Sequence, residues 1–426
     1  MEKRKEYLMA ERRFPGKRSK EKAEKVELEA YRFCGYPSED TQKILMRNIN
    51  GCRGFWNILV SDGEEHYCKT GKRMRRTPAG YKKEAGYEWL SELDSLALAN
   101  VQLDYEKAMD AFLSEDAGHP KRKKKGRCRA SYTTNLSNGK KKNLFLEGDM
   151  LKLPKVKTRI RLNIHRPVRS GGLLKKCTVC KEADRWMFAL VFEYPKVPAD
   201  NKTVKDDAGG ISHIGLDMSL PKLYVDSNGE EADHLKPYRE MEKRLAFEQR
   251  KLSRKIRANT DHYEVRDGKR HPVYRKPLAE CRNIQKQIKK VNALYARTKH
   301  IREDILHKLS AALTDRYELI SIEDLNIASM KQSLKFGKTL SDNGWGAFTR
   351  MLKYKQEKKG HELICVDKWF PSSKTCLRCG HVHKELKLSD REYVCPVCGH
   401  TMDRDHQAAV NIDQEGLRIY KEKYCA

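Results

Sequence analysis

The sequence predicts a multidomain α/β protein, and three observations support this fold class. Its 426 residues are enough for roughly three domains at ~150 residues each. Between residues 206 and 370, short apolar strands alternate with apolar residues at helical spacing. Near the C-terminus two CxxC pairs, Cys376 with Cys379 and Cys395 with Cys398, stand 15 residues apart. That separation can close a four-thiolate zinc site, which predicts a small metal-bound ribbon beside the α/β core.

The composition predicts a nucleic-acid partner. The chain has 88 Lys and Arg residues against 59 Asp and Glu, which gives a formal net charge of +29 and a pI of about 9.5. Binding to a polyanion explains such an imbalance, which self-repulsion would otherwise penalise. The alternative is a basic surface that is merely solvated. No apolar run approaches the ~20 residues of a membrane span, and the first residues lack the apolar core of a signal peptide. We therefore expect a cytoplasmic, nucleoid-associated prokaryotic protein with reduced thiols.

The N-terminal third is predicted to be a tail, one strand and a helical domain. Residues 1–27 are mostly Lys, Arg and Glu, which is typical of a basic tail. Residues 28–37 are rich in apolar and aromatic positions and predict a first strand that ends at Pro37. Apolar residues at helical spacing then predict a mainly helical domain over 38–118, with Ser38 as the N-cap.

Residues 119–205 are predicted to combine basic loops with an antiparallel sheet or barrel. We interpret residues 119–145, with KRKKKGRCR and GKKKN on either side of a Ser/Thr/Asn segment, as loops that face nucleic acid. A solvated charge run is the alternative. Residues 158–167 and 186–194 alternate apolar with polar positions and predict strands. The candidate nucleic-acid contacts are Lys121, Arg122, Lys123, Lys124, Lys125 and Arg127.

A third CxxC pair, Cys177 with Cys180, lies between two predicted strands. No partner pair lies within plausible reach of it. We therefore assign it no zinc and expect a structural or incidental role.

The segment 206–370 is predicted to be a sheet with long helices. ISHIGLDMS and KLYVDSNG are typical of a β-hairpin, and two long basic helices follow. The strand YELISIEDL comes next, then a helix that starts near Asp342, then the strand HELICVD.

Three carboxylates occupy chemically unusual places in this pattern. Asp217 and Glu323 each follow an apolar strand, where desolvation and neighbouring charges penalise a carboxylate. Asp405 lies at a predicted helix start, in a triplet with Asp403 and Arg404. Singly, each acid has a structural alternative as a turn cap or a surface residue. Two Mg²⁺ ions ~4 Å apart need such a cluster of hard ligands, so jointly the three predict an RNase H-like catalytic core.

Three stretches resemble the TnpB family of transposon-encoded RNA-guided endonucleases, which are relatives of the type V CRISPR effectors. GLDMSLPKLYVDSNGE resembles the first RuvC motif of that family and ISIEDLNIASM the second. The block FPSSKTCLRCGHVHKELKLSDREYVCPVCGHTMDRDHQAAVNI resembles its zinc ribbon with the third motif. The resemblance covers roughly residues 29–412, with weaker matches in the N-terminal half.

The resemblance implies a domain layout. A wedge β-barrel would consist of residues 28–37 and 119–205, and the helical segment 38–118 would be a recognition domain inserted into it. Residues 206–370 and 403–426 would form a RuvC-like nuclease domain. Residues 371–402 would be an inserted zinc ribbon that binds the target nucleic acid.

The resemblance also implies the chemistry. Asp217, Glu323 and Asp405 would be the catalytic acids and would bind Mg²⁺, with Mn²⁺ as an alternative, while Cys376, Cys379, Cys395 and Cys398 would hold a structural Zn²⁺. We add Asp403 and Arg404, the neighbours of Asp405, as candidates for supporting the site. The partners would be a guide RNA and a double-stranded and single-stranded DNA target, bound by a monomer.

Two positions depart from the family pattern. Ser219 stands two residues after Asp217, where Gly is usual, and Gln407 stands where Asn is usual. The first could alter the turn beside the metal and the second could weaken a contact at the helix start. Reduced or metal-shifted activity is the expected consequence.

The leading hypothesis is therefore an RNA-guided DNA endonuclease with one RuvC-like site. A nuclease-weak or inactive RNA-guided DNA-binding regulator is the main alternative; loss of an acid would mark it, and all three acids are present. A compact type V CRISPR effector is a further alternative, which a neighbouring CRISPR array would distinguish. A DNA-joining transposase is the last, and nothing in the sequence indicates strand transfer.

Overall fold

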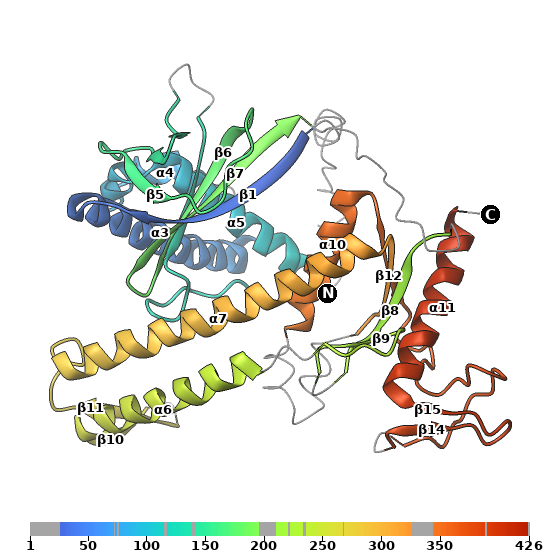
Figure 1. The fold of residues 1–426 in the computed structure, drawn as a ribbon. Coiled ribbons are helices and arrows are strands. Elements are labelled where there is room, and N and C mark those ends of the chain that lie inside the picture. Colours follow the sequence, from blue (N-terminus) through green and yellow to red (C-terminus); the bar gives the residue numbers. More distant parts are fainter. Residues whose placement is uncertain are drawn as a thin grey trace. The chain divides into compact units, whose positions relative to one another are not determined.

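The computed structural model describes residues 26–71, 73–74, 76–114, 117–137, 142–195, 210–219, 222–232, 236–266, 268–325, 344–387 and 390–424 (Figure 1). The chain divides into two compact units, residues 1–197 and 198–426. Most of the predicted basic tail lies outside the described residues. Val26 and Glu27, which the sequence assigned to that tail, instead begin the first strand.

A seven-stranded antiparallel sheet forms the centre of the first unit. Its order is β2-β6-β7-β1-β5-β4-β3. Strand β1 pairs with β5 and β7, so the first strand of the chain lies between strands that come more than 120 residues later. The strands are β1 (Val26–Tyr36), β2 (Ser131–Asn135), β3 (Phe145–Glu147), β4 (Met150–Lys152), β5 (Ile160–Asn163), β6 (Leu173–Glu182) and β7 (Arg185–Pro195).

The sheet fits the sequence pattern in two segments and differs from it in a third. Strands β5 and β7 lie where period-two alternation predicts them, and β7 buries every second side chain. The Ser/Thr/Asn segment, which we expected to be a loop, contains β2. That strand is held by its full register with β6, a pairing between distant segments that local composition does not encode. The buried side chains of β7 are Trp186, Phe188, Leu190, Phe192 and Tyr194.

Helices in the first unit are α3 (Glu39–Thr70), α4 (Pro78–Tyr81) and α5 (Ser95–Leu113), with a short 3₁₀ turn, η1 (Glu88–Glu92). The predicted helical segment is thus confirmed. Ser38 caps α3, since its hydroxyl accepts a hydrogen bond from the Thr41 amide.

A four-stranded sheet of order β13-β12-β8-β9 forms the centre of the second unit. Strands β8, β12 and β13 are parallel, and β9 is antiparallel to β8, which confirms the predicted hairpin. The predicted strands around Glu323 and in HELICVD are confirmed as β12 and β13. The strands are β8 (His213–Asp217), β9 (Val225–Asp226), β12 (Leu319–Glu323) and β13 (Glu362–Val366).

Helices cover both faces of this sheet. On one face, α7 (Arg282–Arg316) and α10 (Trp345–Lys359) bury the apolar side chains of β8 and β12. The other face lies against α11 (Arg404–Tyr424). Asp342, where we expected a helix to start, lies outside the described residues, and α10 begins at Trp345. The apolar contacts of the first face include Ile214, Leu216, Ile320, Ile322, Leu306, Leu313, Phe348 and Leu352.

Two glycines allow α11 to lie directly on the sheet. A Cβ atom on Gly215 of β8 would be 2.3 Å from the Ala409 carbonyl oxygen in α11. A Cβ atom on Gly416 of α11 would be 1.8 Å from the Ser321 hydroxyl in β12. No side chain fits in either gap, so the helix and strands approach as closely as backbones permit.

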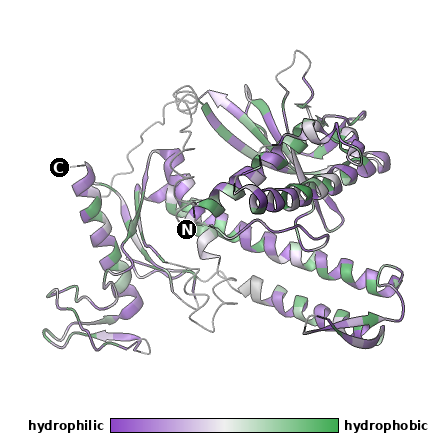
Figure 2. Ribbon diagram, turned by 180° about the vertical axis from the view of Figure 1, so that it is seen from behind, coloured by the Kyte–Doolittle hydropathy of each residue, from purple (hydrophilic) through white to green (hydrophobic). Residues whose placement is uncertain are grey.

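The two predicted basic helices are α6 (Lys236–Ala258) and α7, and they pack along a narrow apolar seam. Figure 2 shows hydrophobic and hydrophilic residues alternating along both helices. In the seam the buried carboxylate of Glu248 contacts Lys290 at 2.8 Å and accepts a hydrogen bond from Gln287. A hairpin of β10 (Thr260–Arg266) and β11 (Lys269–Tyr274) joins the helices. The sequence did not predict this hairpin, because its strands are mostly exposed and lack apolar alternation.

Residues 371–403 form the ribbon, with a two-stranded sheet of β14 (Glu392–Val394) and β15 (Thr401–Asp403). Among the described residues, no helix has the length and apolar character that a membrane crossing requires.

Candidate metal centre and acidic site

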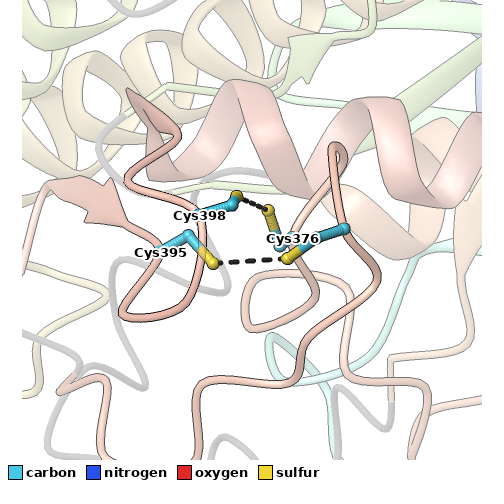
Figure 3. A group of neighbouring side chains, drawn as sticks. Cys376, Cys395 and Cys398 are labelled. Carbon is cyan, nitrogen blue, oxygen red and sulfur yellow. Dashed lines mark hydrogen bonds between the residues drawn. The ribbon is translucent and has the colours of Figure 1, made fainter.

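The four predicted zinc ligands converge. The Sγ atoms of Cys376, Cys379, Cys395 and Cys398 all lie within 4.8 Å of one another. The Cys376–Cys398 Sγ distance is 3.6 Å and the Cys379–Cys395 Sγ distance is 3.5 Å. Figure 3 shows the side chains of Cys376, Cys395 and Cys398 gathered between the two turns. A tetrahedral zinc with Zn–S bonds of ~2.3 Å places its sulfurs about 3.8 Å apart. The cluster therefore fits a four-thiolate zinc site, with no open position for water.

The two CxxC turns, residues 376–381 and 395–400, are called knuckles below. They have the same local structure because they have the same sequence pattern. CLRCGH and CPVCGH each place Gly directly after the second cysteine, and Gly380 and Gly399 have φ angles of 71° and 66°. Each glycine amide donates to the carbonyl of the first cysteine, at 2.9 and 3.0 Å. The tight turn needs this left-handed residue, which glycine adopts without strain.

Backbone amides favour the thiolate form of Cys395. Burial alone would raise the pKa of Cys395, but the N–H groups of Cys398 and Val397 and the neighbouring thiols lower it to about 6. Zinc binds the thiolate, so this arrangement prepares the ligand for the metal.

The ribbon is tied to α11 by buried amide side chains. Gln407, wholly buried, donates to the Thr375 carbonyl at 3.0 Å. Asn411 donates to the carbonyls of Ser372 and Thr375 at 2.7 and 2.8 Å. Gln407 therefore contacts the chain just before the first knuckle, a role that the sequence pattern did not reveal.

Asp217 and Glu323 end neighbouring parallel strands. The register pairs Leu216 of β8 with Ile322 of β12, so the next residues, the two acids, are neighbours at the same edge. Leu216 and Ile322 point into the apolar core under α7 and α10. Because side chains alternate along a strand, both acids project toward the α11 face.

The third acid lies at the start of α11. Asp403 caps the helix, since its carboxylate accepts hydrogen bonds from the amides of Asp405 and His406 at 3.0 and 2.9 Å. Asp405 is in the first helical turn, and its carboxylate contacts Arg404 at 3.3 Å and Arg391 of the ribbon at 3.7 Å. The predicted helix start is thus confirmed, and Arg391 is a neighbour that no sequence pattern indicated.

The acids affect one another electrostatically. Burial, followed by the charges of Asp405 and Glu323, raises the pKa of Asp217 from 3.8 to about 8. Burial also raises the pKa of Glu323. Within the described residues, only the four cysteines bring their ligand atoms within 4.8 Å of one another, so the three carboxylates are less tightly gathered than the thiols. A cation between them would relieve the cost of ionising Asp217.

A small cavity adjoins Glu323, between the end of β12 and the start of α10. Its volume is about 120 Å³, and Glu323, Met218 and Trp345 are among its lining residues. Ser219, which departs from the family pattern, is buried, and its hydroxyl finds no hydrogen-bond partner in the described structure.

The basic segment of residues 121–127 is fixed to α3 by hydrogen bonds. The Trp56 indole donates to the Lys121 carbonyl at 3.0 Å. The Asn57 side chain accepts from the Lys123 amide at 2.7 Å and donates to its carbonyl at 3.1 Å. Lys123 is half-buried, whereas Lys121, Arg122, Lys124, Lys125 and Arg127 are exposed.

Cys177 and Cys180 both lie in β6 and are buried. Cys177 belongs to the apolar core of the sheet, and Arg129 donates to the Cys180 sulfur at 3.2 Å. Both thiols have ordinary structural surroundings.

Two family models match the chain. Residues 196–334 match a family described as "Probable transposase". Residues 345–412 match "Cas12f1-like, TNB domain". The second match covers the ribbon and the start of α11.

Relatives extend the likeness to most of the chain. A Streptomyces pristinaespiralis protein named "Putative RNA-guided DNA endonuclease" is 28% identical over 91% of this chain and 89% of its own length. "Putative RNA-guided DNA endonuclease InsQ" of Escherichia coli K12 is 27% identical over 92% of this chain and 93% of its own.

A solved structure shares the fold. A chain in the cryo-EM structure of a Cas12f1–sgRNA–target DNA complex is similar with a TM-score of 0.55 at 12% identity. The match covers 91% of this chain and 98% of that one.

Proposed function

Because the chain belongs to the TnpB family, we propose that it is an RNA-guided DNA endonuclease that hydrolyses phosphodiester bonds at Asp217, Glu323 and Asp405. One observation carries the proposal. Two carboxylates end adjacent parallel strands on one face of the sheet, and the helix on that face carries the third in its first turn.

The acids would hold the catalytic Mg²⁺, for which Mn²⁺ could substitute. When bound, the metal ions lower the pKa of the attacking water and stabilise the leaving oxygen. The protein's own part is to hold the carboxylates ready. Asp217 and Glu323 are fixed by strand pairing, while Asp405 is fixed by the helix cap and by Arg391 and Arg404.

The zinc ribbon would have a structural role in catalysis. Strand β15 ends at Asp403 and α11 begins at Arg404, so the ribbon leads directly into the helix that bears Asp405. Zinc would thereby fix the third acid without touching the reacting phosphate.

Guide RNA and target DNA would bind to basic surfaces. In RNA-guided nucleases base pairing supplies sequence specificity, whereas the protein holds nucleic-acid backbones and reads a short flanking motif. The net charge of +29 supports this division of labour. We assign the target duplex, the displaced single strand and the guide RNA as partners.

We also propose the domain roles implied by the family. Residues 28–37 and 119–205 would be the wedge barrel, and residues 38–118 the recognition domain. Residues 206–370 and 403–426 would be the RuvC-like nuclease domain, and residues 371–402 the zinc ribbon that contacts the target.

The test is to replace each acid singly by alanine. Asp217→Ala, Glu323→Ala and Asp405→Ala, assayed with guide RNA, target duplex and Mg²⁺, should each lose cleavage by orders of magnitude while retaining target. Glu357→Ala, an exposed acid on α10, is the matched control and should cut normally. An acid whose variant cuts at the wild-type rate would be removed from the site. If the wild-type protein binds its target DNA and never cuts it, the alternative function, an RNA-guided DNA-binding regulator, would be favoured.

A further inference from the structure

The first unit contains a polar cavity that the proposed chemistry does not use. Its volume is about 180 Å³, and it is formed by α3, α5, β2 and the segment 121–129. The cavity is smaller than the ~300–1,000 Å³ pockets that hold drug-sized ligands. Its size therefore suits a small polar group. The charged and polar lining residues include Arg53, Asn100, Asp104, Lys123, Arg129 and Thr133.

Two separate interactions hold Lys123 in the cavity wall, one at its main chain and one at its side chain. Both backbone groups of Lys123 are hydrogen-bonded to the Asn57 side chain, which fixes the main chain. Its ammonium lies 3.7 Å from the centroid of the Trp56 ring, a cation–π contact that fixes the side chain. Among the neighbours Lys121, Lys124 and Lys125, no such contact holds the side chain in the described structure. Lys123 thus offers a fixed positive charge.

The cavity has more positive charge than its acids balance. Arg129 lies 3.7 Å from Glu182, so its charge is partly offset. In the described part of the chain, Arg53 and Lys123 have no carboxylate within ion-pair distance. Asp104 is the one acid among the described lining residues, and it is exposed. Burial lowers the pKa of Lys123, so an anion beside the ammonium would be favourable.

We propose that this cavity binds one phosphate group of a nucleic-acid backbone, held between the Arg53 guanidinium and the Lys123 ammonium. A planar guanidinium and a compact ammonium are the two side chains that proteins use most for phosphate. The partner class rests on the proposed function, whereas cleavage plays no part in the proposal. RNA and DNA present the same phosphodiester, so the experiment separates them.

The test measures binding of the full-length protein to a short single-stranded RNA and to DNA of the same sequence across a salt series. Arg53→Met and Lys123→Met remove the charge but keep the aliphatic stem. Each should lower the slope of log K against log salt by about 0.7 and weaken binding about fivefold at 0.1 M salt. Asp104→Asn should have the opposite effect on affinity, because it removes the acid in the lining. Lys107→Met, an equal change of charge on the exposed face of α5 and outside the cavity, should leave the slope unchanged.

The signs decide the outcome. If Arg53→Met and Lys123→Met behave like Lys107→Met, or if Asp104→Asn weakens binding, the cavity does not hold phosphate. Thermal melts check that each variant folds. If Lys123→Met does not fold, Arg53→Met and Asp104→Asn still decide. A loss confined to RNA identifies the guide, a loss confined to DNA identifies the target, and equal losses show that the phosphate alone is recognised. The same binding measurements can be made in the Asp217→Ala background, since they do not depend on cleavage. Failure of the proposed nuclease activity would therefore leave this test of the cavity unaffected.

Discussion

Gly215 of β8 faces the Ala409 carbonyl of α11 so closely that a Cβ atom would lie 2.3 Å from the oxygen. The same Cβ would lie 2.5 Å from the Asp413 amide nitrogen. Both contacts are with backbone, which has little freedom to move aside. The distance between the strand that bears Asp217 and the helix that bears Asp405 therefore depends on the absence of a side chain at residue 215.

Gly215→Ala should force α11 away from the sheet. Overpacking of this kind costs about 1–3 kcal/mol, and the displaced helix should carry Asp405 out of place. We expect a lower melting temperature and a loss of cleavage larger than the loss of guide binding. Gly118→Ala is the matched control, since a Cβ there meets nothing within 4 Å. Equal stability and activity in the two variants would contradict the close packing.

Cys395→Ser should remove zinc and unfold the ribbon. Four thiolates complete the metal site, and without one of them the cluster holds zinc poorly. We expect lower zinc content by metal analysis, increased proteolysis within residues 371–402 and reduced cleavage, while the sheet of the second unit stays compact. Cys281→Ser, at a thiol outside the cluster, provides the comparison. Full zinc occupancy in Cys395→Ser would disprove the four-cysteine assignment.

Asp217→Asn should stabilise the protein in EDTA, and more so as the pH rises. The folded state raises the pKa of Asp217 from 3.8 to about 8, through burial and the charges of Asp405 and Glu323. When folding raises the pKa of a carboxyl, the free energy of unfolding is highest below pH ~4, where the group is protonated in both states. It falls progressively toward pH ~8, because the unfolded protein ionises the group more easily. Asparagine avoids that loss.

Melting temperatures of Asp217→Asn and wild type should therefore diverge between pH 5 and pH 8. A constant difference across this range would mean that the ionisation of Asp217 is not penalised. Glu357→Gln, at an exposed carboxylate, should show no such trend.

Removing the exposed charges of the basic segment should make nucleic-acid binding less dependent on salt. Lys121→Ala, Arg122→Ala and Lys124→Ala combined should lower the slope of log K against log salt by up to ~0.7–0.9 for each phosphate that the protein no longer neutralises. The main-chain hydrogen bonds from Trp56 and Asn57 should keep the segment in place. An unchanged slope would show that these side chains are only solvated.

Local chemistry made much of the second unit predictable. Each knuckle is a six-residue turn whose cysteines and glycine determine its structure, so the ribbon can be read from sequence. Asp217 and Glu323 stand out because an acid after an apolar strand is costly unless something binds it. Strand β2 and the β10–β11 hairpin had no such signal, since their pairing partners rather than their own apolar pattern define them.

Other features depend on contacts between distant residues. Asn57 fixes Lys123, which is 66 residues away, and a single asparagine on a helix has no sequence signature for that role. Likewise, Gly215 belongs to an ordinary strand sequence until α11 packs on it. The approach of Arg391 to Asp405 also appears only when the ribbon is folded.

The direct passage from β15 into α11 has a consequence for biosynthesis. Strands β8 and β12 leave the ribosome well before the knuckles do, and a nascent chain that has reached β13 carries Asp217 and Glu323 with one face of its sheet still uncovered. Asp405 follows both CxxC turns in the chain, so it can join the other two acids only after the ribbon has been translated. Under the proposed function, the acidic site would therefore stay incomplete until α11 has been synthesised. Zinc supply during translation would then determine what fraction of the chains can cut.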